Sequence, residues 1–447
     1  MVPDTLFQPL QFRNLTIKNR ILRSNVSGRF DNYDGSGNQA RINWEVKFAS
    51  GGVGAILSSF VPVQMRGRIL PNYATLDRDE CIPFWRELGK RVHEYDCKFI
   101  LQLSHGGRQR DLPGFEFPVG LSSTDRADPL HGFQAERMTK REIAETVNAF
   151  AEGARRAREA GLDGVELHSA NGYLITQFLS SAINDRKDEY GGPLENRARF
   201  LREIVRAIRL KVGQDFHLQA KFSATENANA MVLTEPEGNT INESIDVAKW
   251  LEQDGVDAIH VSRGAFFPHP QNPAGDLPIN DFLKVYDAII ASGTETFRNY
   301  LLIRNDLTGE LFHKQWLHAR GDVIEGINLA DAAAIKRAVG IPVLCTGGFQ
   351  TASVVRNAIE SGKCDAVTIA RPLIANNDLV KQFASGADRP AVPCTYCNKC
   401  LVNAVMNPLG CYEESRFKNR EEMVQQILSV FQPPPFAAAA LQNRNSA

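Results

Sequence analysis

Short apolar segments alternate with longer helical patterns along most of this chain, and this alternation limits its fold more than any other feature. Such alternation is typical of parallel βα units. The predicted strands are residues 20–25, 54–60, 98–104, 164–168, 217–223, 258–264, 342–348 and 366–372. Eight parallel strands are the number that closes a barrel. The sequence therefore predicts an α/β fold, a (β/α)8 TIM barrel.

Helical patterns occupy the intervals between the predicted strands. Thr139 to Glu142 has the sequence of a capping box, which marks the start of a helix that we expect to end near Ala160. Apolar residues recur at helical spacing after this box. Further helices are predicted over residues 193–210, 328–338 and 351–361.

Two regions of the 447 residues exceed a minimal barrel, which we assign to residues 1–385. Residues 266–326 form a long insertion, whose apolar stretches 282–290 and 307–316 predict helices packed over the active-site mouth. Residues 386–447 are predicted to form a short irregular extension with several cysteines and a disordered tail.

Charge and hydropathy exclude several classes of partner. The formal net charge is -1, which predicts no attraction to nucleic acid or to an anionic membrane surface. No apolar run approaches the roughly 20 residues that span a bilayer, and the first residues lack the pattern of a signal peptide. We therefore expect a cytoplasmic protein with a small-molecule substrate, and an oligomer is compatible with the sequence.

Three side chains of different chemistry follow the fourth predicted strand. His168 stands at its carboxyl end, and Asn171 and Tyr173 lie on the turn that leaves it. Barrel enzymes build their active sites at this end of the strands. These three residues are therefore candidate catalytic groups. The alternative is structural: a packed tyrosine and a histidine that bonds to backbone.

The ends of the last two predicted strands have the composition of a phosphate site. Gly347 and Gly348 follow the seventh strand, and Ala370 and Arg371 follow the eighth. Paired glycines let a backbone approach a phosphate, and an arginine supplies charge. Barrels commonly hold phosphate in these two loops. The alternative is an ordinary turn beside a surface arginine.

Two polar residues within strands also require partners. Gln102 lies among apolar residues of the third strand, where a carboxamide must be hydrogen-bonded; the pyrimidine edge of a flavin would use both its donor and its acceptor. Lys221, in the fifth strand, could stabilise negative charge on a flavin, form a Schiff base as in aldolases, or make an ion pair at the rim. Residue chemistry alone leaves these roles open.

Residues 168–200, HSANGYLITQFLSSAINDRKDEYGGPLENRARF, resemble the signature of the old yellow enzyme family. Members of this family are FMN-containing ene-reductases built on a (β/α)8 barrel. The resemblance covers about residues 5–385 and includes matching segments in the expected order: Asn19-Arg20, residues 51–54, Gln102, residues 105–108, Gly347-Gly348 and Arg371-Pro372.

The resemblance implies an FMN site at the carboxyl ends of the strands. Backbone near Ser24 and Asn25 and the region of Ser59 would lie under the flavin ring. Gln102 and Lys221 would hold its pyrimidine side, and Gly347, Gly348, Ala370 and Arg371 would hold its phosphate.

The resemblance also implies a reaction. NADH or NADPH would reduce the flavin first and leave, since one site serves both ligands in turn. His168 and Asn171 would donate to the carbonyl oxygen of an α,β-unsaturated substrate. Tyr173 would supply a proton to its α-carbon.

The sequence departs from the family pattern at two places near the flavin. Lys221 stands where many members have arginine, a variant similar to the dienoyl-CoA reductase branch. Ser27 stands where members carry threonine, cysteine or histidine. A hydroxyl there could hydrogen-bond the flavin O4 but lacks the softness of a thiol.

A cluster of cysteines also resembles that branch, whose members bind an iron–sulfur cluster just after the barrel. Cys394, Cys397, Cys400 and Cys411 have two spacings that are one residue shorter than in those enzymes. We expect free thiols and no metal ligands; an iron–sulfur cluster or a zinc site is the alternative.

The leading functional hypothesis is an NAD(P)H-dependent FMN ene-reductase that acts on an activated alkene. One alternative is a flavin dehydrogenase or demethylase with an iron–sulfur cluster. A second, from another class, is a Schiff-base lyase that uses Lys221. A third is a flavin-binding barrel without catalysis.

Overall fold

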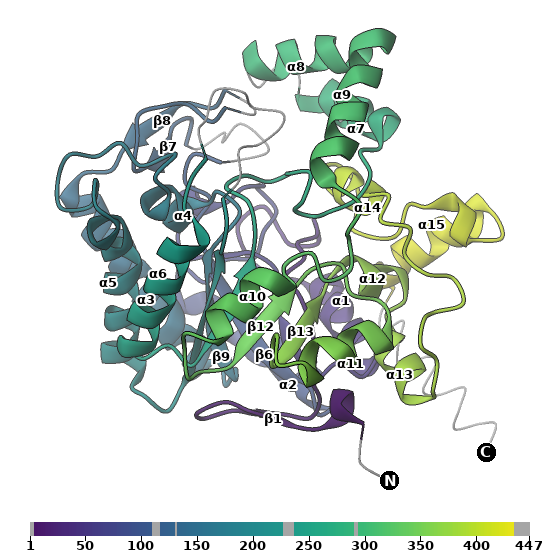
Figure 1. Ribbon diagram of the computed structural model, residues 1–447, viewed down its shortest axis with the longest axis horizontal. Helices are drawn as coiled ribbons and strands as arrows, with labels where there is room; N and C mark the ends of the chain where they lie inside the picture. Colours follow the sequence, from purple (N-terminus) through teal and green to yellow (C-terminus); the bar gives the residue numbers. More distant parts are fainter. Residues whose placement is uncertain (1–3, 110–116, 130–131, 227–236, 290–293, 433–447) are drawn as a thin grey trace.

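A closed barrel of eight parallel strands forms the centre of the computed structural model, which describes residues 4–109, 117–129, 132–226, 237–289 and 294–432 (Figure 1). All eight predicted strands are present, several of them shorter than predicted. They are β3 (Ile21–Arg23), β4 (Ala55–Leu57), β6 (Lys98–Ser104), β9 (Gly164–Ser169), β10 (His217–Ser223), β11 (Ala258–Ser262), β12 (Val343–Thr346) and β13 (Ala366–Ile369). They pair in this order, and β13 pairs with β3, which confirms the (β/α)8 barrel.

Helices surround the strands. They are α1 (Gln39–Ser50), α2 (Ile82–His93), α3 (Lys140–Glu159), α4 (Leu174–Leu179), α5 (Leu194–Val212), α6 (Ile241–Gln253), α10 (Leu329–Lys336), α11 (Ala352–Glu360), α12 (Arg371–Ala375) and α13 (Leu379–Ala384). The predicted capping box is confirmed at α3, where the Thr139 N–H donates to Glu142 at 2.8 Å and the Glu142 N–H donates to Thr139 Oγ1 at 3.2 Å. The four helices predicted within the barrel correspond to α3, α5, α10 and α11.

The remaining strands are short. The hairpin of β1 (Leu10–Gln11) and β2 (Thr16–Ile17) packs across the amino-terminal end of the barrel, β5 (Val61–Pro62) pairs with β6, and β7 (Gly120–Ser122) pairs with β8 (Ala135–Arg137). Within the described residues, no helix is long and apolar enough to cross a membrane.

The interior of the barrel changes from apolar to polar along its axis. At the amino-terminal end it is filled by an apolar cluster that includes Leu22, Ile100 and Leu344 together with the β1–β2 hairpin. Further along, the parallel register places Gln102 beside Glu166, and Lys221 between His168 and His260. Because side chains two residues apart point the same way in a strand, this register presents polar groups together toward the carboxyl end.

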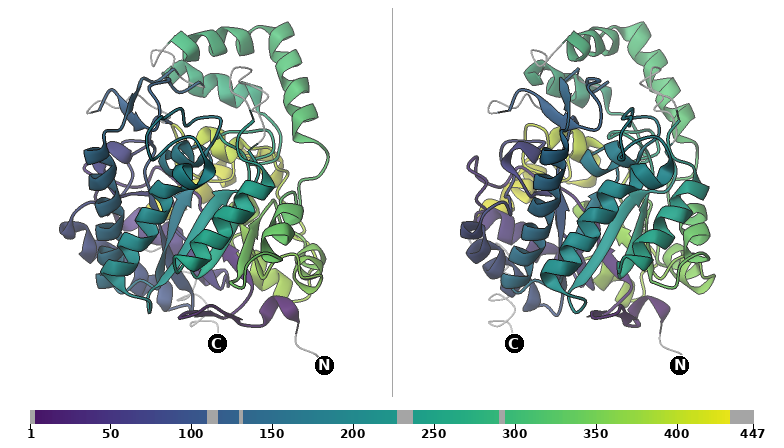
Figure 2. Two further views of the ribbon diagram at one scale, coloured as in Figure 1. Left: turned by 60° about the vertical axis from the view of Figure 1, so that its left-hand side comes forward. Right: turned by 90° about the vertical axis from the view of Figure 1, so that its left-hand side faces the viewer.

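The long insertion contains three helices, α7 (Ile279–Ile289), α8 (Thr294–Arg304) and α9 (Asp306–Arg320), which stand apart from the strands (Figure 2). Within the described residues, both apolar stretches predicted in this region are helical, but the second is not packed as predicted. Leu307 is 69% exposed and Leu311 is 57% exposed, and the burial of α9 is concentrated at Trp316. The apolar side chains near the start of α9 therefore face solvent.

The segment after residue 385 is more regular than predicted. It contains α14 (Lys399–Asn403) and α15 (Arg420–Leu428), and it returns to the barrel, where Asn43 Nδ2 donates to the Val430 carbonyl at 2.8 Å. Val402 and Val405 pack with Val285 of α7. The tail that was predicted to be disordered falls in residues 433–447, which lie outside the described part of the chain.

Candidate active site

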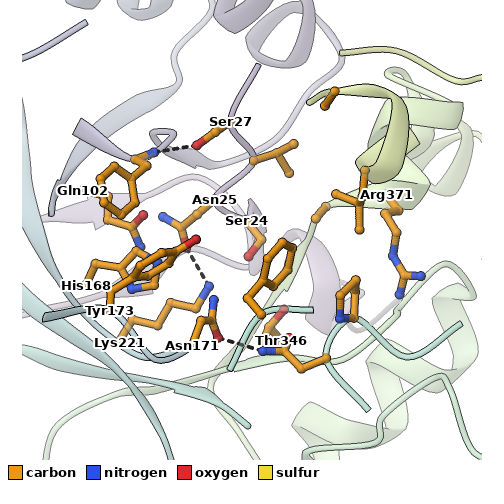
Figure 3. A pocket seen from close by; sticks show the side chains of 18 of the residues that line it. Ser24, Asn25, Ser27, Gln102, His168, Asn171, Tyr173, Lys221, Thr346 and Arg371 are labelled. Carbon is orange, nitrogen blue, oxygen red and sulfur yellow. Dashed lines mark hydrogen bonds between the residues drawn. The ribbon is translucent and has the colours of Figure 1, made fainter. Parts of the chain in front are cut away.

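A pocket opens at the carboxyl ends of the strands and is lined by every predicted site residue except Ser59: Ser24, Asn25, Gln102, His168, Asn171, Tyr173, Lys221, Gly347, Gly348, Ala370 and Arg371. The pocket is elongated. Figure 3 shows Gln102, His168, Tyr173 and Lys221 gathered at one end and Arg371 at the other. This separation suits a ligand that has a ring system at one end and an anionic group at the other.

Ser59 is the one predicted site residue that does not line this pocket. Its hydroxyl is buried and accepts a hydrogen bond from the Arg41 guanidinium. Arg41 in turn pairs with Asp31 at 2.9 Å and with Glu45 at 3.0 Å. The following residue, Phe60, lines the pocket instead.

His168 is a neutral hydrogen-bond donor at one end of the pocket. Burial, followed by the positive charge of Lys221, lowers its pKa well below the ordinary value. The Ala170 N–H donates to His168 Nδ1 at 3.4 Å. A neutral imidazole has one donor and one acceptor nitrogen, so Nε2 carries the proton that a ligand can receive.

Asn171 is oriented by its neighbours. Its Oδ1 accepts from Asn272 Nδ2 at 2.7 Å and from the Ser262 hydroxyl at 3.4 Å, which leaves the amide N–H groups for the pocket. Its backbone has φ of 63°, a left-handed conformation that asparagine tolerates. The next residue, Gly172, has φ of 81°, and a Cβ there would collide with the Ala265 carbonyl oxygen.

Tyr173 begins the turn into α4 and lies within an apolar cluster with Phe60, Ile69, Leu70 and Tyr73. Its ring contacts those of His168 and Phe60 edge to face, with centroids 4.7 Å and 4.9 Å apart. Only 6% of Tyr173 is exposed. The rings hold the phenol beside the imidazole and exclude water from it.

Gln102 supplies the clearest evidence that the pocket is built for a ligand. Its Nε2 donates to Glu166 Oε1 at 2.9 Å. Its Oε1 is fully buried, and among the described residues it has no hydrogen-bond partner. An unsatisfied buried acceptor costs about 1–3 kcal/mol. A ligand N–H, such as that of a flavin pyrimidine ring, would satisfy it.

Glu166 anchors the polar layer beneath the pocket. It also accepts from Gln219 Nε2 at 2.5 Å and interacts with His260 Nδ1 at 2.8 Å. Burial alone would raise the pKa of Glu166, but its interactions with His260 and with Lys221 hold that pKa below its ordinary value. Glu166 is therefore a buried carboxylate that fixes Gln102 and faces the charge of Lys221.

Lys221 points into the same end of the pocket. Its Nζ donates to Asn25 Oδ1 at 3.0 Å, and Asn25 Nδ2 donates to the Ser58 carbonyl at 3.1 Å. Burial lowers the pKa of Lys221 to about 8, although Glu166 opposes this shift. Ser27 also lines the pocket, and its hydroxyl oxygen accepts from the Phe60 N–H at 2.9 Å.

At the opposite end, Gly348 has φ of 71°, and a Cβ there would lie 2.8 Å from the Ile324 carbonyl oxygen. Ala370 precedes α12, and Arg371 is its first residue. Helix starts leave backbone N–H groups without helical partners. Asn328, which the sequence analysis missed, lines this region with a buried Oδ1 that has no partner among the described residues.

Other lining residues also escaped prediction because they lie on connections without a strong pattern. They include Tyr73, Phe267, Asn272, Pro273 and Ala274, and Leu401, Ala404 and Val405 of the extension. The only usable signal was the cluster of prolines at the start of the insertion, which marked the connection but not its contacts. None of the described residues in α7, α8 or α9 lines the pocket.

The four clustered cysteines border a separate small cavity, together with Arg371 and Arg416. No disulfide joins them. Burial, followed by the neighbouring cysteines, raises the pKa of Cys400 well above its ordinary value. The Tyr396 N–H donates to Cys394 Sγ at 3.4 Å. In the described part of the chain, no group of three or more His, Cys, Asp or Glu residues is arranged to hold a metal ion.

The sequence is similar to those of known flavin oxidoreductases. Residues 5–284 match the sequence profile of the NADH:flavin oxidoreductase / NADH oxidase family. An NADH oxidase of Thermoanaerobacter brockii is 32% identical over 427 residues, which cover 92% of this chain and 57% of that protein. An NADPH dehydrogenase of Geobacillus sp. (strain WCH70) is 34% identical over 374 residues, with 83% and 91% coverage. A cinnamate reductase of Clostridium sporogenes is 28% identical, with 95% and 61% coverage.

Solved structures share the fold. A 2-naphthoyl-CoA reductase complex superposes with a TM-score of 0.70 at 24% identity, over 91% of this chain and 56% of that one. An old yellow enzyme homologue from Zymomonas mobilis gives 0.64 at 21% identity, over 86% and 94%. The chain spans only 57% of the NADH oxidase and 61% of the cinnamate reductase.

Proposed function

The chain belongs to the NADH:flavin oxidoreductase / NADH oxidase family, and from this premise we propose that it is an NAD(P)H-dependent ene-reductase. The family uses FMN, with NADH or NADPH as the reductant. When bound, FMN would supply the hydride-transfer chemistry between NAD(P)H and the β-carbon of an α,β-unsaturated substrate. The main support for the proposal is that His168, Asn171 and Tyr173 line the same pocket as Gln102, whose buried oxygen has no partner among the described residues.

His168 and Asn171 bind the substrate carbonyl oxygen in this proposal. The protonated Nε2 of the neutral imidazole and the amide N–H of Asn171 are both donors that face the pocket. Two donors at one oxygen stabilise the negative charge that grows there as the hydride arrives. Because Asn272 and Ser262 hold Asn171 in place, little reorganisation is needed in the transition state.

Tyr173 supplies the proton to the α-carbon. The phenol lies against the His168 ring within an apolar cluster, so it is close to the carbonyl-binding donors and shielded from water. A positioned proton donor of this kind contributes typically about 10²–10⁴-fold to the rate.

Gln102 and Lys221 bind the pyrimidine edge of the cofactor. The free oxygen of Gln102 would accept a ring N–H, and the ammonium of Lys221, which donates to Asn25, would offset negative charge on the ring. At the far end, Gly347, Gly348, Ala370 and Arg371 bind the phosphate. All of these groups line one pocket.

The lowered pKa of Lys221 also suits a Schiff-base amine. We favour the cofactor role because the Nζ is hydrogen-bonded to Asn25 and because Lys221 lines the same pocket as Gln102. Borohydride reduction in the presence of a carbonyl substrate separates the two roles, since only a Schiff base would leave a covalent adduct on Lys221.

A flavin dehydrogenase coupled to an iron–sulfur cluster is the second candidate. Its support is the cavity that the four cysteines share, which also borders Arg371 of the cofactor pocket; within the described residues, however, no three of these cysteines are arranged to hold a metal ion. Four thiolates are the usual ligands of such a cluster. The distinguishing measurement is iron and acid-labile sulfide per chain in protein purified without oxygen.

The proposed function is tested by the visible spectrum of the purified protein under anaerobic conditions. A flavin spectrum that bleaches on addition of NADH or NADPH and returns on addition of a simple cyclic enone is the expected result. A protein that neither contains FMN nor takes it up would refute the proposal and favour a Schiff-base lyase that uses Lys221. Bleaching without recovery by any enone would exclude an ene-reductase while leaving a flavin dehydrogenase.

A further inference from the structure

Arg371, which we propose to bind the phosphate, is held by residues that are distant from it in the sequence. Its Nη1 donates to Asn398 Oδ1 at 2.5 Å, and its Nη2 donates to the Ala274 carbonyl at 2.7 Å. Its guanidinium also lies over the Tyr396 ring, 5.3 Å from the centroid. Arg371 is 5% exposed. A guanidinium has five N–H donors, so two hydrogen bonds fix its plane and leave three donors for an anion.

Two of these contacts come from residues 394–398, which we call the cysteine loop. The loop also docks on the glycine turn after β12. The Tyr396 hydroxyl donates to the Gly348 carbonyl. The fully buried Gln350 pairs with Cys394 in both directions: Gln350 Oε1 accepts from the Cys394 N–H at 2.9 Å, and Gln350 Nε2 donates to the Cys394 carbonyl at 3.1 Å.

The loop itself is rigidly held. Tyr396 and Asn398 both have left-handed backbones, with φ of 57° and 60°. Asn398 Nδ2 donates to the Asp276 carbonyl at 2.8 Å and to the Pro273 carbonyl at 3.3 Å, and the Asp276 N–H donates to the Tyr396 carbonyl at 2.9 Å. The single carboxamide of Asn398 thus joins Arg371 to the connection between β11 and α7.

These contacts converge on the two elements assigned to the phosphate, the glycine turn and Arg371. The buried asparagine satisfies an arginine without neutralising it, whereas a carboxylate in its place would compete with an anionic ligand. The aromatic ring adds a cation–π contact that likewise leaves the positive charge in place.

We propose that the cysteine loop supports the FMN phosphate site from outside the pocket, and that Asn398 and Tyr396 are positioning residues that hold Arg371 and Gly348 in the phosphate-binding arrangement. This inference rests on the proposed function only for the placement of the phosphate. It assigns the extension a role in cofactor retention that is independent of whether the cysteines carry a metal.

The test compares FMN with riboflavin, which lacks the phosphate. FMN is removed from the full chain, and each flavin is titrated back while the quenching of its fluorescence is followed. Asn398→Gly removes the carboxamide without straining the left-handed backbone, and Tyr396→Phe removes only the hydroxyl. Asn403→Gly and Tyr190→Phe are controls, because Asn403 bonds to Asp281 and Tyr190 bonds to Glu203, and neither Asn403 nor Tyr190 lines a cavity with Arg371.

We expect Asn398→Gly to raise the Kd for FMN by about tenfold or more, since a hydrogen bond to a charged group is lost. The Kd for riboflavin should change by less than about twofold. Tyr396→Phe should show a smaller change of the same kind, and both controls should match the unmodified protein. Thermal unfolding of the flavin-free variants establishes that each one folds.

Three results would contradict the inference or its premise in distinguishable ways. If the unmodified protein binds riboflavin as tightly as FMN, the proposed phosphate site is wrong. If the unmodified protein prefers FMN and Asn398→Gly retains the full preference, the cysteine loop has no role in positioning. If Asn398→Gly weakens both flavins equally, its effect is structural, and the proposal fails as well. Should Asn398→Gly not fold, Tyr396→Phe applies the same criteria.

Discussion

At the scale of single residues, the chemistry of the pocket depends on partners that are not themselves in contact with substrate. Asn272 determines which atoms of Asn171 are free, and Glu166 does the same for Gln102. Burial and the charge of Lys221 keep His168 neutral. A carboxamide or imidazole can both donate and accept a hydrogen bond. The hydrogen bond that it makes to a neighbouring residue thus determines whether it donates to a ligand or accepts from one.

Tyr173→Phe isolates the proton-transfer step. The substitution keeps the ring contacts with Phe60 and His168 but removes the only group proposed to protonate the α-carbon. Oxidation of the reduced enzyme by an enone should slow by about 10²-fold or more, while reduction by NAD(P)H stays unchanged. Stopped-flow absorbance resolves the two half-reactions. Tyr190→Phe, whose hydroxyl bonds to Glu203 on the outer helices, is the control; equal rates in all three proteins would remove Tyr173 from the mechanism.

Lys221 gives cofactor binding a pH dependence. Its folded pKa of about 8 lies below the ordinary 10.5, so the flavin-free protein loses this charge as the pH rises through about 8. If FMN prefers the charged form, its affinity should fall across this range. Lys221→Met should bind FMN more weakly with a flat profile between pH 7 and 9. Fluorescence titrations at several pH values measure this, and a flat profile for the unmodified protein would argue against an ammonium beside the ring.

The same pKa shift has a consequence for folding. Since the folded-state pKa of Lys221 is depressed, the unfolded chain binds more protons between about pH 8 and 10.5. The contribution of this residue to the stability of the flavin-free protein is therefore least favourable below pH 8, and it improves as the pH rises through this window.

At the scale of elements, the turn between β9 and α4 determines how the catalytic triplet is presented. Gly164 to Ser169 is an ordinary buried strand, but the left-handed residues Asn171 and Gly172 redirect the chain so that Asn171 and Tyr173 both reach the pocket. The glycine is required twice, because its φ is positive and because the Ala265 carbonyl lies against it.

Gly172→Ala tests this requirement against a matched control. Gly161 has a similar φ of 76°, but nothing lies within 4 Å of the position a Cβ would occupy. Gly161→Ala should therefore cost only the conformational penalty of about 1 kcal/mol. Gly172→Ala should cost that penalty and a further amount on the order of 1–3 kcal/mol for the collision. Chemical denaturation measures both, and equal losses would mean that the backbone relaxes around the added methyl group.

At the scale of the whole molecule, the pocket is assembled from the barrel, the insertion and the extension. Arg29 donates to the Val405 carbonyl, Asn398 joins Arg371 to the Asp276 carbonyl, and Trp316 of α9 donates to the Gly275 carbonyl at 3.0 Å. The three helices of the insertion contribute little to the pocket directly. They attach to the rim of the pocket through contacts such as the hydrogen bond of Trp316 to Gly275.

Trp316 should therefore matter far more than the rest of α9. Trp316→Ala removes a side chain that is 2% exposed and should cost about 3–5 kcal/mol locally. Leu307→Ser and Leu311→Ser change exposed residues and should stay within about 0.5 kcal/mol of the unmodified protein. Hydrogen exchange of the insertion, together with thermal unfolding, measures both effects. A large loss from either leucine would show that α9 is covered in solution.

Much of the barrel could be predicted because its signals are local. Strands such as Lys98–Ser104 and His217–Ser223 have the predicted bounds. The capping box at Thr139 is contained within four residues. Positions such as Lys221 and Gln102 followed from the same reasoning, because their place in a strand determines whether they point inward.

The tertiary structure determines the features that depend on contacts between distant segments. It placed Ser59 against Arg41 instead of in the pocket, left Leu307 and Leu311 exposed, and brought Asn272, Leu401 and Asn398 to the pocket and to Arg371. None of these residues has a periodic pattern around it that points to its partner. Local hydrophobic periodicity determines the order and direction of the strands. The partner of a polar side chain depends instead on which loops meet in space, and these meetings exist only in the folded chain.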